Sequence, residues 1–382
     1  MVQLGAAYRQ VGRTAEARWL LERALERRPD DARIALYLGL AYEDHGDFGR
    51  ARELYGRYLA SDAAPGMREV QRRIRARLPL LARRELEAAV RSAVSREAEL
   101  AGTEPSATRI AVFPFLYEGA DPELRPLGRA LAELLTTDLS QVQRLTVLER
   151  ARVQLLLDEL ALADSGYVDP RTAARGGRLL GAGRIVQGRI SGGENGVQLE
   201  ATVVRVATSE VPAAVREQDD LQRLFDMEKR LALALFESLG VQLTPAERER
   251  VNRRPTQSLQ ALLEYGLGLE AEDAGDYARA AEHYARAAEV DPGFAPAVER
   301  RDQVRDMSVA ATETTLQLGA LAGATPGPTA GFGDAPGLET LLDAMLQQVP
   351  PSTARDAAAE ILGQEGLGQR GVIEVILRPP VR

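Results

Sequence analysis

The sequence predicts an α+β protein in which α-helical hairpins flank a mixed α/β sheet domain. Two observations carry this prediction. One set of residues recurs at a 34-residue period at the amino end and appears again beyond residue 260. Between these regions, short β-branched runs alternate with segments of helical periodicity. A chain of 382 residues also exceeds what a single hydrophobic core usually organises, so we expect two or three domains.

The repeat is visible position by position. The first copy contains Leu4, Gly5, Tyr8, Gly12 and Ala17, which recur 34 residues later as Leu38, Gly39, Tyr42, Gly46 and Ala51. A third copy carries Leu267, Gly268, Gly275, Ala280, Tyr284, Ala287 and Pro292. This period resembles the tetratricopeptide repeat, in which each unit is a helix, a turn and a helix. The small residues are expected where two helices approach closely, and Gly12, Gly46 and Gly275 where the first helix of each hairpin stops.

Such hairpins bury their apolar faces by stacking, and about three neighbouring units are normally needed. The amphipathic segment 67–100 is interrupted at Pro79 and predicts two further helices, which extends the repeat region over residues 1–100. Because the first copy starts a few positions into its helix, we expect a fragment or a mis-started version of a longer protein. The missing piece would hold further repeats and any export signal.

The middle of the chain has the pattern of a sheet covered by helices. Strands are predicted at 109–115, 145–148, 184–191, 197–207 and 211–217, and helices at 124–139, 149–160, 169–180 and 221–239. This order predicts a mixed sheet domain over residues 108–250.

Three strings in this region resemble a known family: IAVFPF at 110–115, LGRALAELLTTDLSQVQRLTVLERARVQLLLDEL at 127–160 and GRLLGAGRIVQGRIS at 177–191. They resemble the TolB amino-terminal domain and the related CsgG family of curli-secretion lipoproteins. Residues 243–297 resemble the segment that connects such a domain to the tetratricopeptide repeats that follow it. The resemblance implies binding to other components of the cell envelope rather than catalysis. The lipid-anchoring cysteine of the family and its long membrane-inserting hairpins are not present, so we do not expect a pore.

Beyond the sheet domain we expect a helical hairpin over 256–317, a linker rich in Gly, Ala, Pro and Thr over 318–337, and a small segment of helices and one strand over 338–382. The strand is predicted at 371–378. A single strand at a chain end needs a sheet edge to pair with, in its own domain or in a partner.

Composition narrows the function. The absence of cysteine excludes disulfides, thiolate zinc sites and thiol catalysis. A net charge of −8 disfavours nucleic acid as a partner. The only lysine is Lys229, and the cluster of Arg72, Arg73, Arg75 and Arg77 is expected to be a solvated helix face. The sequence contains no stretch of 18 apolar residues, so it predicts no transmembrane helix. No signal peptide is visible either.

The sequence offers little for chemistry. We expect surface positions for His45 and His283, neither of which has a catalytic or metal partner at motif spacing. Helix capping explains Asp44, Asp47, Asp273 and Asp276 better than calcium binding. The glycines of 181–183 precede a strand rather than a helix, which is the wrong order for a dinucleotide site. We therefore predict no enzyme, no cofactor, no metal site and no catalytic residue.

Function is then expected to lie on the surface of the repeats. Residues of the first helix of each hairpin line the groove of a repeat stack. The predicted groove residues are Arg9, Gln10, Arg33, Glu43 and Asp44 at one end and Tyr265, Glu272 and Asp273 at the other. The alternative for each of them is an ordinary solvated side chain.

These observations favour a non-enzymatic scaffold that binds proteins or peptides in the periplasm or at the outer membrane and assists assembly or export. Homo-oligomers through the α/β domain, as in an export apparatus, are a second option. A third is a cytosolic regulatory module of a signalling protein.

Overall fold

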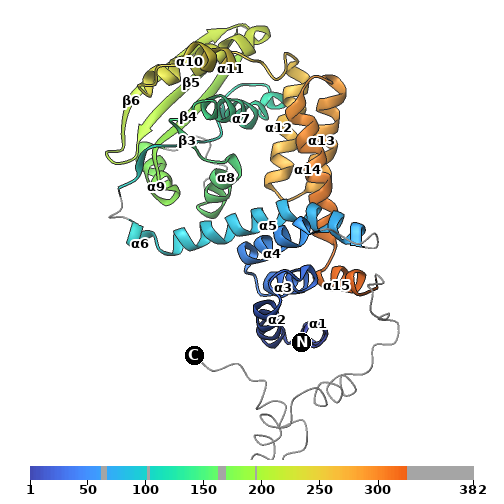
Figure 1. The fold of residues 1–382 in the computed structure, drawn as a ribbon. Coiled ribbons are helices and arrows are strands. Elements are labelled where there is room, and N and C mark those ends of the chain that lie inside the picture. Colours follow the sequence, from blue (N-terminus) through green and yellow to red (C-terminus); the bar gives the residue numbers. More distant parts are fainter. Residues whose placement is uncertain (62–66, 101–103, 162–168, 194–195, 325–382) are drawn as a thin grey trace, which may run out of the picture. The chain divides into compact units, whose positions relative to one another are not determined.

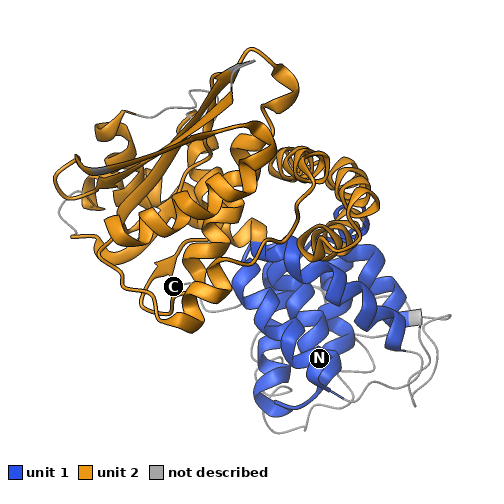
Figure 2. Cartoon of the chain, turned by 90° about the horizontal axis from the view of Figure 1, so that it is seen from above, with its two compact units in different colours: residues 1–82, 309–382 blue, residues 83–308 orange. Residues whose placement is uncertain are grey.

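The computed structural model describes residues 1–61, 67–100, 104–161, 169–193 and 196–324. The chain divides into two compact units: residues 1–82 with the part from 309 onward, and residues 83–308 (Figure 2). We call them unit 1 and unit 2 and describe each by itself. The helices and strand predicted over 338–382 lie outside the described residues. Among the described residues, no helix is both long and apolar enough to cross a bilayer.

The described residues of unit 1 form helices (Figure 1). They are α1 (Val2–Gln10), α2 (Thr14–Arg27), α3 (Ala32–Asp44), α4 (Phe48–Ala60), the first part of α5 (Arg68–Ser95), the end of α14 (Ala295–Thr312) and α15 (Thr315–Ala324). The repeat predicted the hairpins α1–α2 and α3–α4 correctly. Gly12 and Gly46 have φ values of 77° and 80°, a conformation that glycine adopts without strain, and they follow the first helix of each hairpin.

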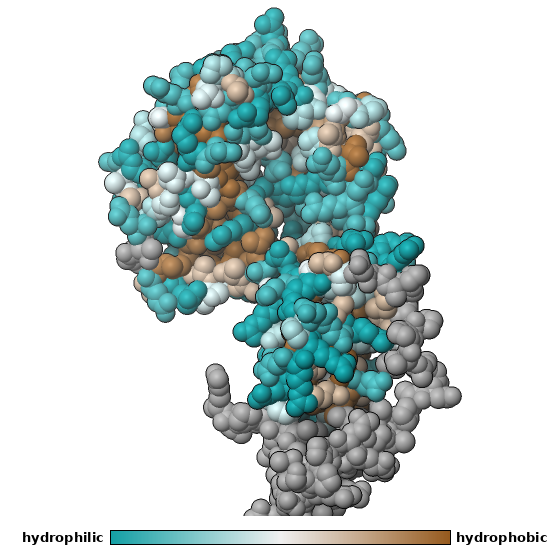
Figure 3. All heavy atoms as spheres, in the orientation of Figure 1, coloured by the Kyte–Doolittle hydropathy of each residue, from teal (hydrophilic) through white to brown (hydrophobic). Residues whose placement is uncertain are grey.

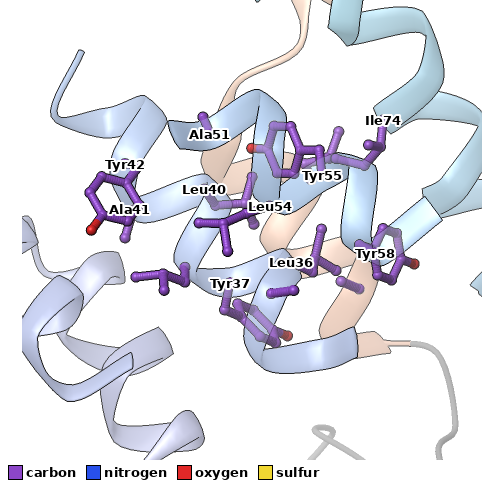
Figure 4. Packing of buried hydrophobic residues seen from close by; sticks show 14 of the residues in the cluster. Leu36, Tyr37, Leu40, Ala41, Tyr42, Ala51, Leu54, Tyr55, Tyr58 and Ile74 are labelled. Carbon is purple, nitrogen blue, oxygen red and sulfur yellow. The ribbon is translucent and has the colours of Figure 1, made fainter. Parts of the chain in front are cut away.

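Close packing between the paired helices depends on glycine. A Cβ added at Gly39 would lie 2.6 Å from Cε1 of Tyr55, and one added at Gly5 would lie 2.7 Å from Cγ of Leu21. Tyr55 is fully buried and packs with Leu36, Leu40 and Ile74 in the core of this unit (Figure 4). The expected close approach of two helices at these small residues is therefore confirmed.

Helix α5 differs from the prediction at Pro79. The sequence predicts two helices broken there, but one helix runs from Arg68 to Ser95 with Pro79 inside it. Proline within a helix removes a backbone hydrogen bond and costs about 3 kcal/mol. Ile74 and Leu81 on either side of Pro79 are both fully buried, and this packing holds the helical register across the proline.

The arginine cluster on α5 is only partly a solvated face. Arg72 and Arg75 are exposed, as expected, whereas Arg77 is 3% exposed. The prediction is wrong for Arg77 because this guanidinium forms a buried ion pair with Glu43, at 2.6 Å.

Unit 2 contains a six-stranded mixed sheet with the order β3-β1-β4-β5-β6 and with β2 paired to β4. The strands are β1 (Ser106–Val112), β2 (Leu116–Tyr117), β3 (Thr146–Val147), β4 (Ala182–Gly193), β5 (Gly196–Arg205) and β6 (Glu210–Asp219). Strand β1 runs parallel to β3 and β4, whereas β4, β5 and β6 are antiparallel. The predicted mixed sheet is confirmed with its five predicted strands, but the first of them ends at Val112 rather than at 115, and the short strand β2 was not predicted.

Helices cover the sheet. They are α6 (Glu97–Leu100), α7 (Leu127–Ser140), α8 (Arg150–Glu159), α9 (Pro170–Leu180), α10 (Leu224–Ser238) and α11 (Pro245–Val251). Helix α9 contacts β4, and α10 contacts β5 and β6. One core joins α8 and α9 to the sheet through Phe113, Leu156 and Ile185. Apolar residues also reach the surface over α8 and α9 (Figure 3).

Short helix α11 was not predicted, although its sequence signal is clear. Thr244 and Glu247 form a capping box, in which each residue bonds the other's backbone N–H.

The third repeat copy forms α12 (Leu259–Asp273) and α13 (Tyr277–Val290), followed by α14. Gly275 has a φ of 78°, and a Cβ at Gly268 would lie 2.5 Å from Cε1 of Tyr284, which repeats the geometry of unit 1. The predicted linker starts too early, because residues 315–324 form α15. Leu318 of this helix is fully buried, which explains why a segment rich in Gly and Ala is ordered.

Candidate protein-binding surfaces

In unit 1, the side chain of Glu43 at the end of α3 is buried and forms hydrogen bonds within the unit. It is 5% exposed. Its Oε2 accepts a hydrogen bond from the Tyr55 hydroxyl at 2.9 Å, and its Oε1 accepts one from Arg77 Nε at 2.8 Å. Arg77 Nη1 also donates to the carbonyl oxygens of Ala310 and Glu313, at 2.9 and 2.8 Å. Glu43 therefore helps to hold α5 and the end of α14 in this unit.

The next residue, Asp44, joins two other elements. Arg9 of α1 donates from Nε to Asp44 Oδ2 at 2.5 Å, and the Thr315 hydroxyl of α15 donates to Oδ1. The Arg9 side chain is 2% exposed and that of Asp44 is 16% exposed. The sequence-predicted residues Arg9 and Asp44 thus lie together and bind one another as well as α15.

A cavity lies beside the first residues of α1 and α3. This cavity of about 280 Å³ is lined by Met1, Val2, Gln3, Ala6, Arg28, Asp31, Arg33 and Tyr37. Asp31 caps α3 by accepting the N–H groups of Arg33 and Ile34. Arg33 is half-buried in the wall of this cavity, and Gln10 is exposed at the end of α1. Of the residues predicted in this region, Arg33 alone lines this cavity.

In unit 2, Glu272 occupies the position of Glu43 and repeats its bonding. The Tyr284 hydroxyl donates to Glu272 Oε2 at 2.6 Å, and Arg300 Nη1 donates to Oε1 at 2.9 Å. Burial disfavours the charged carboxylate, but Arg300, Arg150 and the Tyr284 hydroxyl outweigh it and hold the pKa of Glu272 below its ordinary value. Burial, together with the charge of Glu272, raises the pKa of Tyr284 well above its ordinary value.

Asp273 connects the repeat hairpin to the sheet domain. Its Oδ1 accepts a hydrogen bond from Arg150 Nη1 of α8 at 2.6 Å, and its Oδ2 accepts one from Arg129 Nε of α7 at 3.2 Å. The side chains of Arg150 and Asp273 are 3% and 6% exposed. Arg300 adds a second link, with 2.9 Å from its Nη2 to Glu133 Oε1 of α7. We call Glu133, Arg150, Glu272, Asp273 and Arg300 the docking network.

Tyr265 of α12 lies in the core of the same hairpin. It is 2% exposed, and its ring centroid is 5.3 Å from that of Tyr284 and 4.9 Å from that of Phe294. In unit 2 the three predicted groove residues are therefore all engaged within the unit.

The capping prediction holds for half of the aspartates. Asp47 and Asp276 accept the backbone N–H groups of Arg50 and Arg279 and cap α4 and α13. Asp44 and Asp273 form ion pairs instead, because they are the last residues of the preceding helices, where the free backbone groups are carbonyls.

The histidines also differ from one another. His45 is exposed, as expected. The prediction is wrong for His283, which is 8% exposed, because α13 turns it toward α12, where its Nδ1 lies 2.8 Å from Glu264 Oε2.

One cluster was missed by the sequence reasoning. Lys229 of α10 lies 2.7 Å from Asp138 Oδ2 of α7 and 3.2 Å from Glu228 Oε2. All three side chains are at most 7% exposed. Burial, with the charge of Glu228, raises the pKa of Asp138 to about 9, against the opposing effect of the Lys229 ammonium. The signal in the sequence was the only lysine of the chain, placed in an apolar helix.

Among the described residues, no group of three or more His, Asp or Glu side chains is arranged to hold a metal ion. The polar clusters around Glu43 and Glu272 are made of arginine and carboxylate pairs, which join helices to one another.

Comparison with known families agrees with this architecture. Residues 2–68 match the tetratricopeptide repeat model, and residues 91–205 match the model of the curli production assembly/transport component CsgG. The chain thus joins a region that matches the tetratricopeptide repeat model to a region that matches the CsgG model. The resemblance to the tetratricopeptide repeat is thereby confirmed for residues 2–68, and the resemblance to the CsgG family for residues 91–205.

Individual proteins are more distant. A putative adenylate cyclase 3 of Rhizobium meliloti (strain 1021) is 28% identical over 204 residues, which are 50% of this chain and 32% of that protein. The chain thus spans about a third of the length of this curated relative. The LpoB C-terminal domains of Salmonella enterica and Escherichia coli are each 16% identical, with a TM-score of 0.26, and cover 35% of this chain and 98% of theirs.

Proposed function

We propose that this protein is a non-enzymatic protein-interaction scaffold of the bacterial cell envelope. The tetratricopeptide region of unit 1 presents the binding surface, and the CsgG domain with its following hairpin forms a rigid body. The observation that carries the proposal is the docking network, in which a repeat hairpin is fastened to the CsgG domain by buried ion pairs.

The network argues against a free groove on the second hairpin. Burying an ion pair is costly unless both charges are well bonded, and Asp273 has two guanidinium partners. Glu272 likewise bonds to Tyr284 and Arg300. A partner could reach these carboxylates only by breaking bonds within unit 2. The surface available for binding is therefore best sought in unit 1.

In unit 1 the open cavity has the chemistry to bind a carboxylate. Arg28 and Arg33 line it together with Tyr37. Guanidinium groups bind carboxylates through two parallel hydrogen bonds, and aromatic side chains supply apolar contact. We infer that the partner carries an acidic peptide segment and that Arg33, the sequence-predicted residue in the wall of this cavity, contacts it.

The experiment is capture of partners from the native cells by the full chain, with chemical cross-linking and mass spectrometry. The double substitution Arg28→Glu and Arg33→Glu should remove the specific partners and their cross-links to α1 and α3. Arg23→Glu is the matched control, because Arg23 is 55% exposed on α2 and pairs with Glu26 of the same helix. Equal capture by all three proteins would contradict the assignment of the surface.

Location tests the envelope part of the proposal. The matched family is described as a component of curli production, assembly and transport. This description supports the proposal that the protein is exported. Fractionation of the native cells should place the protein with the periplasm or the outer membrane. The alternative is a cytosolic regulatory module, which is favoured by the relative named as an adenylate cyclase. Recovery in the cytosol alone would favour this alternative.

The absence of catalysis has its own test. The purified chain incubated with ATP and a divalent cation should form no cyclic AMP above the level of a buffer blank. Formation of cyclic AMP that depends on the protein concentration would refute the non-enzymatic assignment.

A further inference from the structure

Helix α15 lies against the first helices of the repeat region, although it is distant in sequence. Thr315 and Asp44, which share a hydrogen bond, are 271 positions apart. Leu318 and Ala322 of α15 are 0% and 1% exposed and belong to the core that includes Leu36 and Leu40 of α3. The chain thus places one of its own helices on the face of α1 and α3.

Two further contacts of α15 make its packing on this face specific. Near its start, the Thr315 hydroxyl binds Asp44, which is also bound by Arg9. One turn later, Gly319 lets the Arg9 side chain approach, since a Cβ there would lie 2.6 Å from Arg9 Nη1. Leu318 and Ala322 are four residues apart, so they form one stripe along the helix. This is the geometry of a helix bound in a groove.

The start of α15 is defined by its own sequence. Gln317 Oε1 accepts the Thr314 N–H at 2.8 Å, and Thr314 Oγ1 accepts the Gln317 N–H at 3.2 Å, which together form a capping box. The preceding turn is fixed separately, by Arg77 on the carbonyl oxygens of Ala310 and Glu313. The helix can therefore leave the groove while its anchor at residues 310–313 remains in place.

Several features favour exchange over permanent burial. Helix α15 has 10 residues, and isolated helices of this length are marginal in water. It carries no charged residue, so its release breaks no ion pair of its own. Its Leu316 is 49% exposed, so only the side of the helix that carries Leu318 and Ala322 is buried.

We propose that the face of α1 and α3 is a helix-binding groove and that α15 is its exchangeable occupant. A partner protein enters by supplying an uncharged helix of the same pattern: a hydroxyl in the first turn, a leucine three residues later, a glycine next to it and a small residue one turn further on. The proposal deepens the proposed interaction function and rests on it for the existence of a partner.

The test uses the absence of cysteine from the chain. Ala322→Cys places one thiol on the buried side of α15, and Ala51→Cys places one in α4, where Ala51 is 0% exposed. The rate of labelling by a thiol reagent reports how often each site opens. We expect the Ala322→Cys variant to react at least about a hundredfold faster than the Ala51→Cys variant, since α15 would open without unfolding of the unit. Equal rates would overturn the proposal.

Exchange is then tested with a synthetic peptide of residues 313–324 added in excess to the Ala322→Cys variant. The peptide should accelerate labelling of the α15 thiol by occupying the groove, whereas the same peptide with Leu318→Asp should not. No acceleration by the unchanged peptide would overturn the exchange. Within the chain, Leu318→Asp should also accelerate labelling, and Leu316→Asp, at an exposed position of the same helix, should leave it unchanged.

A separate measurement covers the case in which a cysteine variant misfolds. Amide hydrogen exchange of the unmodified chain should show α15 opening faster than α3 and α4, and equal protection would contradict the proposal. Failure of these tests would leave the capture experiment at Arg28 and Arg33 standing, because the cavity there is lined by residues of α1, α3 and the turn before α3.

Discussion

Two adjacent acids at the end of the first hairpin helix have the same roles in both units. Glu43 and Glu272 each accept the hydroxyl of a buried tyrosine of the second helix and the guanidinium of an arginine further along. Asp44 and Asp273 instead bind an arginine from the element that lies against the first helix. The first acid thus stabilises the hairpin stack, and the second selects what docks on it.

Removing the second acid in unit 2 should be costly. Asp273→Ala leaves Arg150 buried with one fewer partner, and breaking a buried pair costs about 3 to 5 kcal/mol. We expect about 3 kcal/mol, at the low end, because Arg150 Nε keeps Glu133 at 3.5 Å. Native-state hydrogen exchange in α12 measures the change. The control is Glu270→Ala, at a 55% exposed side chain of the same helix, which should change the free energy by at most about 0.5 kcal/mol. Equal effects would show that the docking network contributes no stability.

The Asp138 cluster predicts an unusual dependence of stability on pH. Its carboxyl has a pKa of about 9 in the folded protein and an ordinary value of about 3.9 in the unfolded chain. Because the folded pKa is raised, the stabilising effect of the bound proton is complete below the unfolded pKa and is lost as the pH rises toward 9. The native protein should therefore lose stability relative to Asp138→Asn by up to about 1.4 kcal/mol per pH unit.

Urea unfolding followed by circular dichroism from about pH 5 to about pH 8 measures this difference. Glu228→Gln is an independent check, since burial is the largest cause of the raised pKa of Asp138 and the charge of Glu228 adds to it, so that removing this charge should weaken the pH dependence in part. A difference between the native chain and Asp138→Asn that stays constant with pH would show that Asp138 is ionised beside Lys229.

At the scale of elements, the sequence was most informative where the signals are local. The glycines that end helices and the small residues within helices predicted the hairpins, and the alternating segments predicted the mixed sheet. Helix α5 continues through Pro79, and α15 is buried, because of contacts between segments that are distant in sequence. The periodicity of apolar residues gives no information about such contacts. The same limit applies to the groove residues, since spacing placed Glu43 and Asp273 on a helix but not the arginines that bind them.

Helix pairing gives a sharp prediction from two glycines of one hairpin. Gly39→Ala should destabilise unit 1 by about 1 to 3 kcal/mol, because the new methyl group would lie 2.6 Å from Tyr55 Cε1 in a filled core. Gly56→Ala on α4 meets no atom within 4 Å and should stabilise the helix by about 1 kcal/mol. Hydrogen exchange in α3 and α4 measures both. Effects of the same sign would contradict the role of Gly39 in close packing.

At the scale of the whole molecule, the two units have separate sets of buried residues. The core around Leu36, Tyr55 and Leu318 lies in unit 1, and the core around Phe113, Leu156 and Ile185 lies in unit 2. Helices α5 and α14 contribute residues to both units. Whether these helices transmit unfolding decides whether the chain behaves as one cooperative body.

We expect the units to open independently, because Gly39 packs against Tyr55 in unit 1 whereas Asp273 binds Arg150 in unit 2. Gly39→Ala should accelerate hydrogen exchange in α3 and α4 and leave α12 and α13 unchanged, and Asp273→Ala should do the reverse. In the double variant, the two changes in opening free energy should add within about 0.5 kcal/mol. A single substitution that accelerates exchange equally in all four helices would show instead that α5 and α14 make the two units unfold together.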